Sequence, residues 1–302
     1  MTLPDPAGAG LVPKRRLLLV HAHPDDETIT TGATMGHHAA TGAHVCLVTC
    51  TRGEQGEVIP PQLAHLSGAA LGAHREGELA AAMRELGVSD HRFLGAASGV
   101  RFLDSGMALD GAGGVVLPED VVAGAFALAD VDLAAELLAA VIDEVRPQAV
   151  ITYDPSGGYG HPDHVQAHRV TMRAVELARW PVARVYWIVV PASAMAAERV
   201  RLAEPDNPFA AWPDDAPSPG VVADDQVSAL IDGHAVLDRK AAALRAHATQ
   251  VSVQRPFFAL SNDLGQLIAP IEYYHLAQGG PLPDGEPLID LFAGLDGDDL
   301  SE

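Results

Sequence analysis

The chain has 302 residues, of which 48% are hydrophobic, so it is long enough to bury a substantial core. Its formal net charge of −21 argues against nucleic acid or an anionic membrane as a partner, because both recruit clustered lysine and arginine. It has no apolar run of about 20 residues that could cross a membrane, and its N-terminal segment lacks the apolar core of a signal peptide. Its two cysteines form no disulfide framework. We therefore expect a soluble, cytoplasmic protein.

The N-terminal part of the chain alternates between apolar strands and helices. Residues 16–21 (RLLLVH) are a continuous apolar run, which predicts a strand buried on both faces. A helix is predicted over 29–41, with Thr28 as its N-cap and Gly42 at its end. The same periodicities predict a strand at 44–50, a helix at 73–87 and a strand at 91–95.

The alternation is interrupted once and then resumes. Residues 96–128 are rich in glycine, alanine and serine and show no periodicity, so we interpret them as an irregular insertion. The pattern then predicts a helix at 132–145, a strand at 148–154, a helix at 164–178 and a strand at 184–190. Such alternation is typical of an α/β fold with a doubly wound, mostly parallel sheet of Rossmann-like topology.

The composition changes after residue 190. A proline- and aspartate-rich connector (204–220) precedes a predicted helix at 233–247, and the acidic residues 292–302 form a tail that we expect to fray. We therefore divide the chain into an α/β catalytic core, 1–190, and a smaller C-terminal α/β cap region, 191–302, that packs on it.

Charged segments follow three of the predicted strands. They are HAHPDDE (21–27), TRGEQGE (51–57) and YDPSGGYGHPDH (153–164). In open α/β sheets, sites form outside the carboxyl ends of the strands. We therefore expect these three segments, although remote in sequence, to converge on one edge of the sheet.

The first and third segments carry a set of metal ligands. His23 and Asp26 (HxxD) supply one nitrogen and one oxygen, and His164 supplies a second nitrogen. Two histidines and one carboxylate leave the fourth tetrahedral position open for water, which is typical of a catalytic zinc site, although ferrous iron suits the same ligands. Either motif alone is more often a surface or capping feature. Their occurrence at the ends of two buried strands favours a metal.

Further side chains in these segments fit hydrolytic chemistry. Asp25, beside the ligand Asp26, is placed to act as general base. His161 could donate a proton or stabilise an oxyanion, and Asp163 could fix its tautomer. Tyr159, in a glycine-rich loop, offers a hydroxyl for a carbonyl oxygen. The alternatives are that Asp25 only opens a helix and that Tyr159 only packs.

These motifs resemble a known family. AHPDDE after the first strand, with HPDH in the later glycine-rich loop, resembles the zinc-dependent GlcNAc-inositol de-N-acetylase superfamily. The stretches TRGEQGEVI, REGELAAAMRELGV, DSGM, TYDPSGGYGHPDH and LRAHATQ resemble its mycothiol branch and cover most of residues 16–250. The resemblance implies the same metal ligands and catalytic residues as the spacing, with one Zn²⁺ per subunit.

The resemblance also implies substrate contacts that spacing does not reveal. Arg75, Asp104 and Glu57 match positions that hold the sugar and inositol hydroxyls. From the residues alone, Arg75 could be a surface helix residue, Asp104 a turn former, and Glu57 a residue that stiffens its loop. The implied partner is a small amino-sugar inositol substrate, and the sequence indicates no oligomeric state.

Two activities compete within the mycothiol branch. One is deacetylation of 1-D-myo-inosityl 2-acetamido-2-deoxy-glucopyranoside during mycothiol biosynthesis, and the other is hydrolysis of the amide of mycothiol S-conjugates. GGYG before HPDH resembles the deacetylase, since the amidase tends to have proline there, and Thr30 stands where the amidase type carries lysine. The resemblance therefore implies the deacetylase, with the S-conjugate amidase as the alternative.

Two other classes of protein fit the sequence less well. A nucleotide-binding redox protein needs closely spaced glycines after its first strand, and residues 21–28 contain none. A sugar-binding module without catalysis has no use for the additional carboxylate of Asp25 beside the metal ligands. The sequence therefore favours a metal-dependent hydrolase.

Overall fold

The computed structural model describes residues 15–111, 114–213, 220–280 and 287–295. A central sheet has the strand order β3-β2-β1-β6-β7-β13-β9, and β8 (Val221–Val222) pairs with β7 beside this path. The first five strands of this order pair in parallel. They are β3 (Asp90–Phe93), β2 (His44–Thr49), β1 (Arg16–His21), β6 (Ala149–Tyr153) and β7 (Arg184–Pro191).

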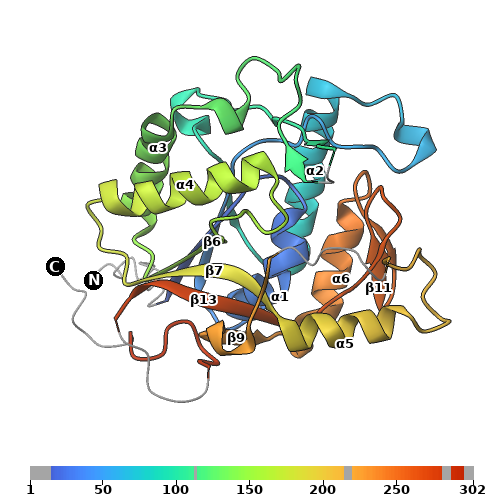
Figure 1. The fold of residues 1–302 in the computed structure, drawn as a ribbon. Coiled ribbons are helices and arrows are strands. Elements are labelled where there is room, and N and C mark those ends of the chain that lie inside the picture. The colour runs from blue at the N-terminus through green and yellow to red at the C-terminus, as the bar shows by residue number, and fades with distance from the viewer. Residues whose placement is uncertain (1–14, 112–113, 214–219, 281–286, 296–302) are drawn as a thin grey trace, which may run out of the picture.

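Helices cover both faces of this sheet (Figure 1). On one face lie α3 (Val131–Val145) and α4 (Pro162–Leu177), and on the other lie α1 (Asp26–Ala40), α2 (Gly68–Leu86) and α6 (Leu237–Ala246). Alternate residues of β1 serve the two layers, since Leu18 and Val20 pack with α3 and α4 while Leu17 and Leu19 pack with α1 and α2. The predicted α/β class with a mostly parallel sheet is thus confirmed.

Several helices begin earlier than their apolar periodicity indicates. Helix α1 starts at Asp26, not residue 29, and Asp25 is its N-cap in place of Thr28, whose hydroxyl bonds Glu27 instead. Helix α2 starts at Gly68, before the predicted residue 73. Helix α4 starts at Pro162, not residue 164, so the HPDH motif forms its first turn.

The segment 96–128 is mostly irregular but anchored. It contains short 3₁₀ turns and a two-stranded hairpin, β4 (Ala108–Leu109) with β5 (Val115–Val116). Phe102 and Phe126 are buried against each other, with ring centroids 5.3 Å apart. The loop is therefore held at the carboxyl edge of the sheet by its own apolar residues.

The C-terminal region contributes to the central sheet. Strand β13 (Ile271–Gly279) pairs antiparallel with both β7 and β9 (Ala229–Asp232). The region also contains α5 (Ala192–Leu202) and a separate three-stranded sheet of β10 (Ser252–Gln254), β11 (Phe257–Ala259) and β12 (Gly265–Leu267). Residues on both sides of position 190 therefore share one sheet.

Parts of the sequence-based expectations lie outside the described residues. These are the N-terminal segment up to residue 14, part of the connector (214–219) and most of the acidic tail (296–302). The helix predicted at 233–247 begins at Leu237, after a 3₁₀ turn. None of the helices in the described part of the chain has both the length and the apolar character to span a bilayer.

Candidate metal centre

The three charged segments leave the sheet at adjacent strands. Strands β2, β1 and β6 are neighbours and parallel, so their carboxyl ends lie at one edge. After β1 the chain continues to β2, on one side of β1, whereas after β6 it continues to β7, on the opposite side of the sheet order. The loops that follow β1 and β6 therefore diverge. A crevice at such a reversal of strand order is where open α/β sheets bind ligands.

The predicted metal ligands meet at this edge of the sheet, where β1 and β6 are neighbours. His23 follows β1, Asp26 is the first residue of α1, and His164 lies in the first turn of α4. Asp26 Oδ2 is 3.2 Å from His23 Nδ1 and 3.3 Å from His164 Nε2. The two histidines are buried, and their rings lie 5.4 Å apart. One carboxylate thus lies between two imidazoles drawn from separate segments.

The hydrogen bonds around this cluster fit a bound cation. His164 Nδ1 is 3.2 Å from the Gly157 carbonyl, which places the ring proton on Nδ1. His164 Nε2 is then an acceptor, and it is buried without a hydrogen-bond partner. On Asp26, bonds from the His23 backbone N–H and the Tyr153 hydroxyl both go to Oδ2, at 2.9 and 2.7 Å. Oδ2 is also the oxygen that faces the ring nitrogens of His23 and His164.

Electrostatics support the same conclusion. Burial lowers the pKa of His23, but Asp104, Asp163 and Asp26 outweigh it and raise this pKa well above its ordinary value. Burial likewise raises the pKa of Asp26, but His164 and His23 outweigh it and hold that pKa well below its ordinary value. Buried carboxylates in this number need a compensating positive charge. A protonated His23 supplies part of it in the metal-free protein, and the His/Asp cluster suits a bound cation.

Among the described residues, the groups of three donor atoms that lie close enough to share one cation differ from the predicted set, although both contain His23. Two overlapping sets have ligand atoms within 4.8 Å of one another, namely His23 with His161 and His164, and His23 with Asp104 and Asp163. The carboxylates of Asp104 and Asp163 both accept backbone N–H groups. Asp26 accepts a backbone N–H as well, from His23, so these bonds do not rank the three carboxylates as ligands.

Asp25 lies beside this cluster in an unusual backbone conformation. Its φ is 117°, a value that residues other than glycine rarely adopt. Burial raises the pKa of Asp25 to about 6, although the Arg75 guanidinium, 3.1 Å from Asp25 Oδ2, opposes the shift. A carboxyl with a pKa close to neutrality suits a general base.

His161 and Tyr159 lie at the N-terminal end of α4 and in the loop just before it. His161 is the N-cap of α4, and its Nδ1 accepts the backbone N–H of Asp163 at 3.1 Å, which leaves the ring proton on Nε2. Burial and the neighbouring His23 and His164 lower the pKa of His161 to about 2, so its ring is neutral. Tyr159 is 43% exposed, with its ring 5.1 Å from that of His164. Both side chains can donate a hydrogen bond.

The Asp163 carboxylate has other contacts than the one the sequence suggested. It accepts the backbone N–H and hydroxyl of Ser105, at 2.9 and 2.5 Å, and lies 3.2 Å from His23 Nε2. The backbone N–H of Asp163 therefore fixes the tautomer of His161. The side chain of Asp163 instead connects Ser105, in the insertion 96–128, to His23 in the metal cluster.

The predicted substrate-binding residues occupy different environments. Asp104 is buried, accepts the Gly106 and Gln55 backbone N–H groups, and has its Oδ1 3.5 Å from His23 Nε2. Glu57 is exposed on the loop after β2. Arg75 is only 3% exposed. The geometry thus leaves Glu57 accessible and Asp104 close to the cluster.

The Arg75 guanidinium is engaged by the chain itself. It donates to the carbonyl of Gly53 at 2.7 Å, to the carbonyl of Pro24, and to Asp25 Oδ2. Arg75 therefore holds the loop that carries Asp25.

Sequence reasoning missed Tyr153. Its hydroxyl donates to Asp26 and accepts the Ala22 backbone N–H at 3.0 Å, and its ring stacks on His164 with centroids 4.3 Å apart. Its place at the end of a predicted strand, directly before the glycine-rich loop, was the available signal. Also missed were Ser105 and a buried pair, Glu27 with His247, whose residues are too far apart for any local pattern.

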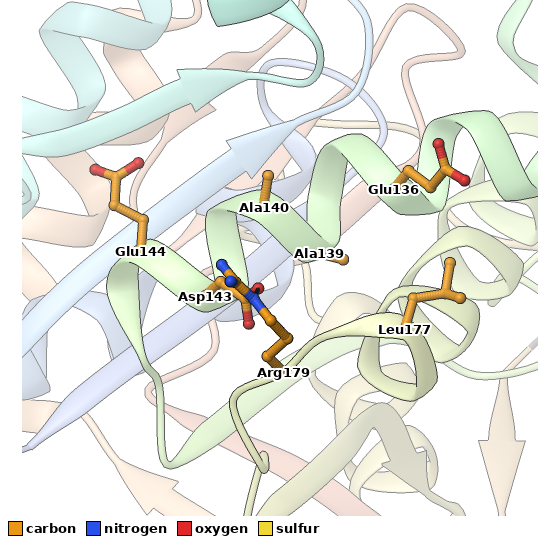
Figure 2. A pocket seen from close by; sticks show the side chains of 7 residues that line it. All are labelled: Glu136, Ala139, Ala140, Asp143, Glu144, Leu177 and Arg179. Atoms are coloured by element: carbon orange, nitrogen blue, oxygen red, sulfur yellow. Dashed lines mark hydrogen bonds and ion pairs between the residues drawn. The ribbon is translucent and has the colours of Figure 1, made fainter. Parts of the chain in front are cut away.

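A surface hollow lies elsewhere, between α3 and the end of α4 (Figure 2). Its lining includes Glu136, Asp143 and Glu144 with Arg179, and Arg179 donates to Asp143 at 2.8 Å. None of these residues belongs to the metal cluster. We assign the hollow no role, because its one cation is already paired within the lining.

Fold and site together define an α/β protein with a buried metal-binding centre at the carboxyl edge of its sheet. The sequence model described as "PIG-L: GlcNAc-PI de-N-acetylase" matches residues 18–175, which is more than half of the chain. The chain belongs to this family.

Relatives across the full length support the assignment. A 1D-myo-inositol 2-acetamido-2-deoxy-alpha-D-glucopyranoside deacetylase of Streptomyces griseus is 56% identical and covers 94% of this chain and 90% of its own. One of the same description from Streptomyces avermitilis is 54% identical, over 94% and 98% of the two chains. Among solved structures, the 4-carboxy-2-hydroxymuconate hydratase of Pseudomonas putida has a TM-score of 0.52 at 18% identity, over 90% of this chain and 100% of its own. That likeness shows the fold alone.

Proposed function

We propose that this protein is a metal-dependent deacetylase that hydrolyses the acetamide of 1-D-myo-inosityl 2-acetamido-2-deoxy-glucopyranoside, giving acetate and the free glucosaminyl-inositol of mycothiol biosynthesis. The observation that carries the proposal is the cluster of the buried His23 and His164 with the half-buried Asp26, preceded in the chain by the additional carboxylate of its neighbour Asp25. The substrate is supported by the descriptions of the full-length relatives.

The resident ion is Zn²⁺, one per subunit, held by His23, Asp26 and His164. Two nitrogens and one oxygen suit a catalytic zinc, and ferrous iron fits the same donors. The unpartnered His164 Nε2 supports His164 as a ligand. When bound, the ion polarises a carbonyl oxygen and lowers the pKa of a water molecule.

The residues around the cluster divide the remaining chemistry. Asp25 accepts a proton from the attacking water as its oxygen adds to the acetyl carbon. Tyr159 and the Nε2–H of His161 donate hydrogen bonds to the carbonyl oxygen, which becomes negative. When the C–N bond breaks, Asp25 returns the proton to the amine nitrogen. The low pKa of His161 supports this division, because a neutral ring is a hydrogen-bond donor but a poor acid.

Substrate recognition involves the loops after β2 and β3. Glu57 and Asp104 bind hydroxyls of the sugar and inositol, supported by the exposure of Glu57 and by the position of Asp104 beside His23. Arg75 contributes to recognition by fixing the loop after β2, through Gly53, and the loop after β1, through Pro24. Asp163 supports the site through Ser105.

The wider expectations belong to the same proposal. The order of the five parallel strands supports a doubly wound, Rossmann-like topology. Two buried, unpaired cysteines, Cys46 and Cys50, are in keeping with a reaction in the cytoplasm.

The test is acetate release from the glucosaminyl-inositol substrate before and after chelation. We expect turnover to disappear on complete metal removal and to return with Zn²⁺, and Fe²⁺ is compared in parallel. Asp25→Ala should lower kcat by about 10²–10⁴-fold with the metal content unchanged. Full turnover by the metal-free protein would contradict the proposal. A kcat/KM higher for a mycothiol S-conjugate than for the acetylated substrate would favour the amidase.

A further inference from the structure

A buried ion pair, Glu27 with His247, lies next to the backbone of Asp25. Glu27 in α1 and His247 at the end of α6 are both 0% exposed, and Glu27 Oε1 is 2.9 Å from His247 Nε2. The two residues are 220 positions apart in the sequence. Burying such a pair is costly unless its hydrogen bonds are complete. Here His247 Nδ1 has no hydrogen-bond partner among the described residues, and the other bonds of the pair go to Thr28 and to the backbone of Asp25.

Glu27 connects this pair to the backbone of Asp25. Its second carboxylate oxygen, Oε2, accepts the Asp25 backbone N–H at 2.8 Å. Oε1 also accepts the Thr28 hydroxyl at 2.5 Å. Because the φ of Asp25 is 117°, its conformation persists only if the surroundings enforce it. The bond to Glu27 is one of the contacts that do so.

His247 is itself held firmly. Its backbone carbonyl accepts the N–H groups of Gln250 and Val251, at 3.0 and 2.9 Å. Two residues further on, the backbone N–H and hydroxyl of Thr249 bind the Glu78 carboxylate of α2, at 2.8 and 2.6 Å. The C-terminal region therefore presents His247 to Glu27 from a fixed position.

Neither member of the pair can reach a substrate. Both are fully buried, and their hydrogen bonds go to each other, to Thr28 and to the Asp25 backbone. The Asp25 side chain instead contacts Arg75, which lies in α2. Backbone and side chain of Asp25 are thus fixed by different neighbours.

We propose that Glu27 and His247 are positioning residues, which hold the backbone of Asp25 so that its carboxylate stands beside the metal cluster. His247, in the C-terminal region, thereby helps to fix the backbone conformation of Asp25, the general base in the N-terminal region. This inference rests on the proposed role of Asp25 as general base.

The test is a double-mutant cycle on the zinc-loaded full chain. Glu27→Ala should lower kcat for acetate release by about 10²-fold, with KM changed less than about threefold and zinc per chain unchanged. Glu27→Gln keeps a carbonyl oxygen for the Asp25 N–H and should retain about tenfold more activity than Glu27→Ala. In an Asp25→Ala background, Glu27→Ala should cost less than about twofold, because it acts only through Asp25.

The matched control is Glu272→Gln. Glu272 is also buried and accepts backbone N–H groups of α1, from Ala33 and Thr34, but it pairs with Lys240 and does not contact Asp25. Its effect on kcat should be the same with and without Asp25. His247→Asn gives a second route to the same cycle if Glu27→Ala does not fold.

The outcomes separate this inference from the proposed function. Two results would overturn the positioning role. One is a loss of kcat from Glu27→Ala that is equal in the wild-type and Asp25→Ala backgrounds, and the other is a Glu27→Ala variant that loses its bound zinc. In either case, turnover by the wild-type protein would still uphold the deacetylase. An inactive, zinc-loaded wild-type protein would overturn the deacetylase itself, and the role of Glu27 with it.

Discussion

At the scale of single residues, Asp25 combines a costly environment with a functional one. It is mostly shielded from solvent, its φ is 117°, and its neighbours include the carboxylates of Asp26 and Glu27. Arg75 offsets only part of this cost, so the pKa remains raised to about 6. A residue under such strain that also lies beside a metal cluster is more readily explained by catalysis than by folding.

Replacing Asp25 with asparagine should therefore stabilise the metal-free protein. The folded-state pKa lies above the ordinary value of 3.8, so the stabilisation by the protonated form is complete below about pH 4 and is lost as the pH rises through about 6. A pKa raised by about two means that ionised Asp25 lowers the free energy of unfolding by about 3 kcal/mol. Asp25→Asn should therefore raise Tm by about 5 °C at about pH 8 and by little at about pH 4.

Calorimetry of the chelated proteins across this pH range checks the expectation, with acetate release showing the accompanying loss of activity. Asparagine also tolerates a positive φ, so the backbone is not an additional variable. If the Tm of Asp25→Asn at about pH 8 is equal to or lower than that of the wild-type protein, ionised Asp25 does not destabilise the fold.

The residues of the site differ in how far they can be predicted from sequence. His23, Asp26 and His164 lie in short motifs at the ends of apolar strands, and local patterns identify them. The hydrogen bond between Tyr153 and Asp26 spans 127 positions. No local pattern records which distant side chain satisfies a buried one, so such partners emerge only from the fold.

At the scale of elements, the glycine-rich loop before α4 sets the position of a metal ligand. Gly157 has a φ of 69°, and its carbonyl is 3.2 Å from His164 Nδ1. A Cβ at Gly157 would lie 2.7 Å from the Val165 backbone nitrogen and 2.8 Å from His164 Cβ. Gly158 also has a φ of 69°, but a Cβ there would meet no atom within 4 Å.

Gly157→Ala and Gly158→Ala should therefore separate backbone strain from displacement of a ligand. Both lose about 1–2 kcal/mol of stability from a positive φ. Only Gly157→Ala must move His164, so it should weaken zinc binding by about 10–100-fold. Competition with a chromogenic chelator measures the affinity. Equal zinc affinities in the two variants would contradict a positioning role for this loop.

Two of the elements that sequence patterns missed lack a readable periodicity, whereas the nine-residue strand β13 was missed despite its length. Helix α5 buries only Leu202, so it has no apolar stripe that would predict a helix. Strand β9 has four residues, too few for an alternating pattern to stand out. The early start of α1 at Asp26 follows from the charged turn at its N-terminus, which apolar periodicity does not register.

At the scale of the whole molecule, the C-terminal region completes both the sheet and the site. Strand β13 pairs with β7, and Tyr186 and Tyr274 from these two strands are fully buried with rings 6.3 Å apart. His247 reaches from the end of α6 to Glu27 in α1. The division into a core, 1–190, and a C-terminal region, 191–302, remains a prediction that these contacts make testable.

We expect the fragment 1–190 not to fold alone. Without β13 the long strand β7 becomes an exposed edge, and Tyr186 loses part of its cover. Without His247 the carboxylate of Glu27 is buried and unpaired, which is strongly destabilising. Circular dichroism and size-exclusion chromatography should show no cooperative thermal transition and aggregation for the fragment. Co-expression with 191–302 should restore both the transition and zinc binding, whereas cooperative unfolding of 1–190 by itself would identify it as an independent domain.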